Sequence, residues 1–118
     1  MTKRPDGALE HEIMTVLWHA DRPLQPGEVK PLLQAHLAYT SVATVLGRLH
    51  TKGLVERVEA GRAFAYRASI DESQLAVRRI SDVLSSTSDK RKVLAGFVGS
   101  LSKKDAKALR TMLEIGEP

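Results

Sequence analysis

Four polar residues recur at the spacing of one helical face: Ser41, Thr44, Arg48 and either Lys52 or Thr51. Hydroxyl and basic side chains are the groups that bond DNA phosphates and base edges. A guanidinium can bond O6 and N7 of guanine together, and we expect the Lys52 ammonium to meet a phosphate where the helix ends. No aspartate or glutamate occurs at residues 29–55, so no carboxylate in this segment would repel a polyanion. The pattern therefore indicates a DNA-facing helix surface.

The helix that carries this face is predicted over about 41–52. Its other side has the i, i+3, i+4, i+7 spacing of a buried stripe, formed by Val42, Val45, Leu46 and Leu49. We expect a hydroxyl of residues 39–41 to cap its start and Gly53 to end it. Gly47 in its interior costs about 1 kcal/mol relative to alanine, which the close approach of another backbone, from protein or DNA, would explain.

The flanking segments predict two helices before this one and a hairpin after it. A first amphipathic helix is expected over about 8–19, and a second from Pro26 through Leu37, with Pro31 placed in its first turn. Leu24 lies between them in an extended segment that could pair with a later strand. Strands are expected at 54–58 and 63–67, joined by a turn that contains Gly61.

This order of elements is that of a winged helix-turn-helix. In that fold the third helix lies in the major groove, and the hairpin, or wing, reaches the flanking backbone or the minor groove. Arg62 stands beside Gly61 at the wing tip with no apolar role, and it suits a backbone or minor-groove contact. The expected fold class is mainly α with a small β-hairpin wing, an α+β arrangement.

The remaining chain predicts a helical tail. Asp71 with Gln74, and Ser102 with Asp105, have the spacing of capping boxes that open helices. The tail carries strong apolar stripes but is too small to bury them alone, so a second copy would cover them. We therefore expect a DNA-binding domain at 1–69 and a dimerisation domain at 70–118, with two-fold symmetry matching a palindromic operator. The residues expected at the dimer interface are Ile80, Val83, Leu84, Val93, Leu94, Phe97, Val98, Leu101, Leu109 and Leu113.

Composition favours a DNA-binding protein and argues against an enzyme. The 118 residues carry a net charge of +4 and no cysteine, so disulfides and thiolate metal sites are impossible. His11-Glu12 begins a zinc-protease motif, but Thr15 stands where the second histidine is needed. We expect no catalytic residue, metal or cofactor. No signal peptide or bilayer-spanning segment is predicted, which indicates a cytoplasmic protein without membrane insertion.

Three segments resemble the penicillinase-repressor family, also called the BlaI/MecI/CopY family: LEHEIMTVLW, AYTSVATVLGRLHTKGLVERV and GRAFAYRASIDES. With the tail KVLAGFVGSLSKKDAKALRTMLE, the resemblance covers nearly the whole chain. It implies a homodimeric repressor with interlocked C-terminal helices and two wings on a palindromic, double-stranded operator. It also places Thr40, Ser41, Thr44, Arg48 and Arg62 on the DNA face. Ala43 stands where relatives often have a longer side chain, and it cannot hydrogen-bond a base.

The resemblance also bears on regulation. In the antibiotic-responsive branch of the family, a membrane sensor metalloprotease leads to cleavage of the repressor tail before a phenylalanine. The matching bond here is Gly96–Phe97, although those relatives have asparagine where this chain has Gly96. The copper-responsive branch carries cysteine pairs near the C-terminus, and this chain has none.

A winged helix can also serve as a protein-interaction module, which is the alternative function. Such a module should expose apolar or aromatic residues on the third helix. The face formed by Ser41, Thr44 and Arg48 carries none, and this favours DNA.

Overall fold

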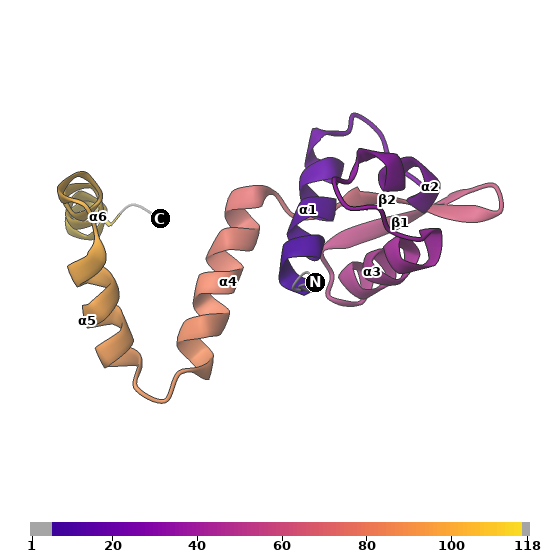
Figure 1. Ribbon diagram of the computed structural model, residues 1–118. Coiled ribbons are helices and arrows are strands. Elements are labelled where there is room, and N and C mark those ends of the chain that lie inside the picture. The colour runs from indigo at the N-terminus through magenta and orange to yellow at the C-terminus, as the bar shows by residue number, and fades with distance from the viewer. Residues whose placement is uncertain (1–5, 117–118) are drawn as a thin grey trace. The chain divides into compact units, whose positions relative to one another are not determined.

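The computed structural model describes residues 6–116 and is mainly helical with a two-stranded antiparallel sheet, which confirms the expected fold class (Figure 1). The chain divides into two compact units between Leu75 and Ala76, inside the fourth helix. The elements in chain order are α1 (Asp6–His19), α2 (Pro26–Val29), the 3₁₀ helix η1 (Lys30–Leu32), α3 (Tyr39–Thr51), β1 (Val55–Ala60), β2 (Ala63–Ala68), α4 (Glu72–Ser86), α5 (Lys90–Ser100) and α6 (Lys103–Ile115).

The core of the first unit forms where α1 and α3 pack against each other and against the sheet. Ile13 and Met14 of α1 are fully buried, as are the predicted α3 residues Val42, Leu46 and Leu49. Burying side chains of this size stabilises the fold by about 1.5–3 kcal/mol each. The stripe predicted for α3 is thus its buried side, and this fixes which side of α3 faces solvent.

The second helix is much shorter than the sequence suggested. The α-helix ends at Val29 and is followed directly by the 3₁₀ helix η1. The chain is not helical from Leu33 to Ala38. Pro31 lies beyond the first turn counted from Pro26, so it removes an intrahelical hydrogen bond and its ring would crowd the carbonyl four residues earlier. The prediction of a helix through Leu37, with Pro31 tolerated in its first turn, was wrong for this reason.

The start of α3 also differs from the prediction, whereas its end agrees. The N-cap is Ala38, and no side chain caps the helix there, so residues 39–41 lie inside the first turn instead of capping it. At the other end Gly53 has a φ of +77°. Its N–H donates to the carbonyl of His50, and that of Leu54 donates to the carbonyl of Leu49, both at 3.0 Å. This pair of bonds is a Schellman motif, which requires a residue such as glycine.

The hairpin has a two-residue turn, because Ala60 pairs with Ala63 across Gly61 and Arg62. Gly61 has a φ of +72°, and no non-glycine residue within residues 6–116 has a positive φ. This is the pattern of a type II′ turn, whose twist suits a hairpin. Leu24 pairs with Tyr66 through two backbone hydrogen bonds of 2.9 and 2.7 Å, which confirms the expected extra pairing.

The first unit extends through the start of α4. Trp18 is partly buried and its indole N–H donates to the carbonyl of Ile70 at 2.8 Å. The Asp71–Gln74 capping box is present: the Asp71 carboxylate accepts from the backbone N–H of Gln74 at 2.8 Å, and the Gln74 side chain accepts from that of Asp71 at 2.9 Å. The Gln74 N–H and the Ser73 hydroxyl lower the pKa of the Asp71 carboxyl. Leu75, one turn into α4, is buried.

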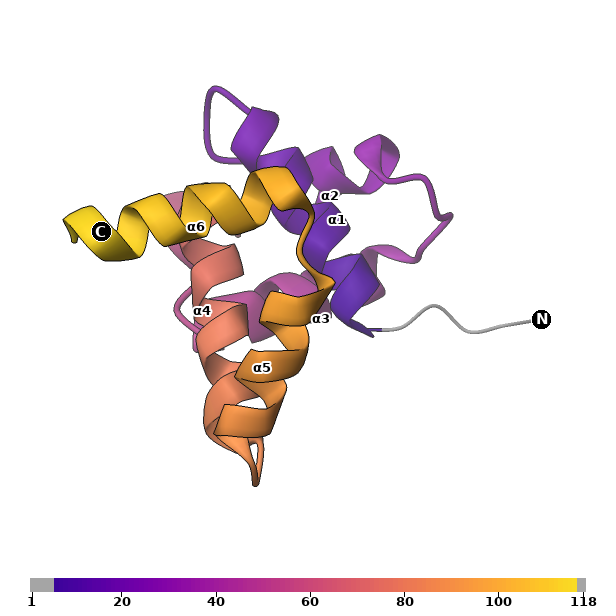
Figure 2. The same ribbon diagram turned by 90° about the vertical axis from the view of Figure 1, so that its left-hand side faces the viewer.

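In the second unit, α4 and α5 form a V-shaped pair and α6 runs in a different direction from α5 (Figures 1 and 2). Asp89 caps α5 by accepting from Lys92, and Ser102 caps α6 by accepting from Asp105, each at 3.0 Å. No residue of α5 or α6 is buried. Within residues 6–116, no helix has both the length and the hydropathy needed to cross a membrane.

Candidate nucleic-acid interface

The outer face of α3 exposes every residue predicted there. Thr40, Ser41, Thr44 and Arg48 are all exposed, while Ala43 and Gly47 on the same helix are intermediate. Thr51 adds a third exposed threonine, in line with Thr40 and Thr44. The face carries no acid. The face therefore presents short hydroxyls, bordered on one side by the small residues Ala43 and Gly47 and on the other by the long cation Arg48.

Two of these three threonine hydroxyls, those of Thr44 and Thr51, are already engaged as donors within the helix. The Thr44 hydroxyl donates to the carbonyl of Thr40 at 2.8 Å, and that of Thr51 donates to the carbonyl of Gly47 at 3.1 Å. Phosphate oxygens can only accept hydrogen bonds, whereas base edges offer both donors and a thymine methyl group. In this conformation Thr44 is therefore suited to meet a base edge and not a phosphate.

Lys52 is held by an acid of α1. Its ammonium lies 2.9 Å from both carboxylate oxygens of Glu10. The Glu10 side chain is 8% exposed and that of Lys52 is 48% exposed. A buried carboxylate is costly unless it is paired, so this contact stabilises the packing of α1 against α3. The pairing favours a structural role for Lys52 over the phosphate contact expected from the sequence.

The wing places Arg62 at the hairpin turn, where it is exposed. Figure 1 shows the β1–β2 hairpin extending beyond helices α1–α3. The turn is thus free to reach a ligand that also contacts α3.

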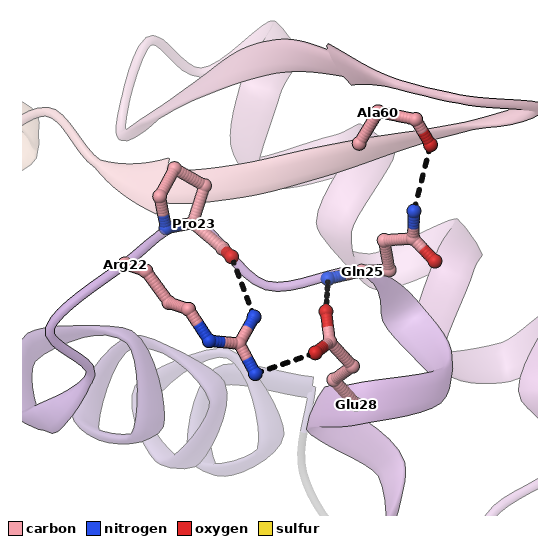
Figure 3. A network of polar contacts seen from close by, with 5 residues as sticks. All are labelled: Arg22, Pro23, Gln25, Glu28 and Ala60. Carbon is pink, nitrogen blue, oxygen red and sulfur yellow. Dashed lines mark hydrogen bonds and ion pairs between the residues drawn. The ribbon is translucent and has the colours of Figure 1, made fainter.

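A network of polar contacts connects the N-terminal end of α2 to the hairpin (Figure 3). The Gln25 side-chain amide donates to the carbonyl of Ala60, the last residue of β1, at 2.8 Å. The backbone N–H of Gln25 donates to Glu28 at 2.9 Å, and Glu28 forms an ion pair of 2.6 Å with Arg22. The Arg22 guanidinium and then the Gln25 N–H lower the pKa of Glu28. Gln25 thus links the helix-turn-helix to the strand that leads into the wing turn.

Arg57 of β1 is a further basic residue beside α3, and it was not among the residues predicted from the sequence. Its guanidinium carbon lies 4.9 Å from the ring centre of Phe64 and 5.8 Å from that of Tyr66. A methyl-sized group on Gly47 would lie 3.8 Å from Nη2 of Arg57. Arg57 pairs with Tyr66 in the register of the hairpin, so the two side chains lie on the same face. The alternation of side chains along the strands was the signal that could have revealed this contact.

The predicted dimer residues lie on α4, α5 and α6, except for Leu101, which is the C-cap residue of α5. Among them Ile80, Val83, Phe97, Val98 and Leu113 are more than half exposed. An apolar groove between α4 and α5 is lined by Arg79, Ile80, Val83, Leu84, Val93, Leu94 and Phe97. The Gly96–Phe97 bond lies inside α5. Within residues 6–116, no group of three or more His, Asp or Glu side chains could hold a metal.

Known proteins are similar to this chain over nearly its whole length. A sequence profile of the penicillinase repressors matches residues 7–115. The transcriptional regulator BlaI from two strains of Mycobacterium tuberculosis is 34% identical over 112 residues, which cover 91% of this chain and 81% of that protein.

Two solved structures are similar to this chain to different extents. The solution structure of Bacillus licheniformis BlaI, in its monomeric form in complex with the blaP half-operator, is 29% identical with a TM-score of 0.47. The match covers 63% of this chain and 88% of that one. A complex structure of hsRosR-S4 is 24% identical with a TM-score of 0.51, covers 86% of this chain and 90% of that one, and shows the same fold.

Replacing Lys52 with alanine should destabilise the protein. The change leaves the buried Glu10 carboxylate without its ammonium partner, and we expect a loss of about 1–3 kcal/mol in the free energy of unfolding, measured by denaturant titration. Adding Glu10→Gln should recover part of the loss, while Lys107→Ala, an exposed lysine of α6, should change little. Unchanged stability together with a lower salt dependence of DNA binding would instead assign Lys52 to a phosphate.

Replacing Gln25 with alanine should loosen the wing. We expect a stability loss of about 0.5–1.5 kcal/mol for the hydrogen bond to Ala60, and a weaker contribution of Arg62 to DNA binding. A double-mutant cycle measures this: Gln25→Ala and Arg62→Ala should combine to less than the sum of their separate effects on affinity. The exposed Gln34 serves as the control position. Full additivity would show that Gln25 does not position the wing.

Proposed function

The chain belongs to the penicillinase repressor family and is a DNA-binding transcriptional repressor, and we propose that it binds a palindromic operator as a homodimer. The observation that carries the proposal is the outer face of α3, which is exposed, free of acids and rich in short hydroxyls. Such a face suits the major groove, and the projecting wing suits the flanking backbone or minor groove.

Each residue of the surface has a proposed role. Arg48 bonds a guanine edge or a phosphate, and Thr44 contacts a base edge because its hydroxyl proton is used inside the helix. Thr40 and Ser41, in the first turn of α3, donate to the phosphates at the rim of the groove. Arg62 at the wing turn contacts the backbone or the minor groove.

We further propose that the second unit forms the dimer. Most large apolar side chains of α4, α5 and α6 are exposed in one chain, and those of α4 and α5 line one apolar groove. An exposed apolar surface of this kind marks an interaction site. A second copy would bring an identical apolar groove and would generate a two-fold axis. Two copies related by that axis would present their α3 helices to the two halves of a palindrome.

Cleavage at Gly96–Phe97 is the proposed route to release from DNA, brought about by a membrane sensor metalloprotease. Gly96 and Gly99 both lie inside α5, and no heavy atom would contact an added methyl group at either. Each glycine lowers helix stability by about 1 kcal/mol. The segment around the bond therefore unwinds more readily than an alanine-containing helix, as a protease requires.

The test of DNA binding begins by selecting sequences from a random duplex library with the full chain. We expect a palindromic consensus bound by two chains per duplex. Arg48→Ala should abolish the preference for that consensus while the fold and dimer persist. Arg62→Ala should weaken binding to all sequences alike and lower the salt slope by about one unit. No enrichment by the wild-type protein would point instead to a protein partner.

The dimer is tested by placing a charge on each side of α5. Phe97→Asp should give a monomer in sedimentation, because the carboxylate would be buried at the interface. Ala95→Asp adds the same charge on the exposed opposite side of the helix and should remain a dimer. The monomer should also bind the selected duplex less tightly. A dimer of unchanged stability with Phe97→Asp would place the interface elsewhere.

A further inference from the structure

We infer that Arg57 contacts the DNA backbone, at the phosphates of the strand that would pass between α3 and the wing. The rings of Phe64 and Tyr66, here called the aromatic clamp, hold its guanidinium in place before DNA binds. The inference rests on the proposed docking of α3 and the wing. When a helix lies in the major groove and an adjacent hairpin reaches the minor groove, the sugar-phosphate strand between the two grooves must run between those elements. A cation at that junction meets phosphate.

The position of Arg57 fits this junction. It lies on β1 with its guanidinium beside Gly47, one of the two small residues that border the threonines of α3. Successive residues of a helix turn by 100°, so Gly47 and Arg48 stand on opposite sides of Thr44 around α3. A long side chain at position 47 would occupy the space into which Arg57 extends. This gives Gly47 a second reason to be small.

The clamp fixes the guanidinium without neutralising it. Arg57 lies over the rings of Phe64 and Tyr66, at 4.9 and 5.8 Å. Stacking on an aromatic face is a favourable cation–π interaction and leaves the edge N–H donors of the guanidinium available for an anion. Because fewer rotamers remain to be lost on binding, a held side chain gains more net affinity from a phosphate than a freely rotating one.

The other charges on the hairpin limit where the phosphate can lie. Glu59 is exposed on the same face of β1, two residues nearer the turn. Its carboxylate would repel a phosphate there, so the contact is confined to the α3 end of the strand. Arg67 lies on the opposite face of the sheet and is paired with Glu56 at 2.8 Å. It therefore provides a matched control with the same change in charge.

The experiment measures affinity of the full chain for a mixed-sequence duplex over a series of salt concentrations. Arg57→Ala should weaken binding roughly tenfold, as for a lost charge-assisted hydrogen bond, and should lower the salt slope by about 0.9. Arg67→Ala should change affinity less than about twofold, since an exposed ion pair contributes little. Equal effects of the two substitutions would overturn the inference, because they would report only the loss of charge.

The clamp is tested with Phe64→Leu, which keeps an apolar side chain at this exposed position. We expect weaker binding that is not additive with Arg57→Ala, and thermal unfolding by circular dichroism should confirm that both variants fold. Additive effects would overturn the clamp. A failure of the docking proposal is distinguishable, because Arg48→Ala and Arg62→Ala would then also leave binding unchanged.

Discussion

The burial of one side of α3 is the constraint on which the DNA surface depends. Val42, Leu46 and Leu49 are fully buried against α1 and the sheet. A helix turns 100° with each residue, so any rotation of α3 would expose part of this stripe at a cost of about 25 cal/mol per Å². The rotation is therefore fixed, and Thr40 and Thr44 must face solvent. The Lys52–Glu10 pair adds a polar tie at the end of the same interface.

The placement of the wing depends on a very short segment of chain. Leu24 pairs with Tyr66 through its backbone, and the next residue, Gln25, bonds Ala60 through its side chain. These two contacts hold both strands of the hairpin to the segment that opens α2. A hairpin of two strands is marginally stable by itself. The helix-turn-helix thus supplies the support that lets the wing project toward DNA.

The sequence predicted the elements governed by local periodicity and turn chemistry. The stripe of α3, Gly53 as its terminator and the capping box at Asp71 depend on residues within one or two turns of each other. The pairing of Leu24 with a later strand was expected, but side-chain contacts between distant positions were missed. The partner of Lys52 is 42 residues away, and the stacking of Arg57 depends on strand register. The effect of Pro31 was misjudged because its place in the helix was counted as the first turn. The assigned DNA and dimer residues stay predictions.

The two units differ in the source of their stability. The first unit buries a core of its own, whereas α5 and α6 bury no residue at all in one chain. Order in the second unit would therefore be coupled to association with a second copy, and so to protein concentration. A dimer binds the second half of a palindrome at a high effective concentration, and a separated monomer loses that gain. An event inside α5 could thus release the protein from DNA without changing any residue of α3 or the wing.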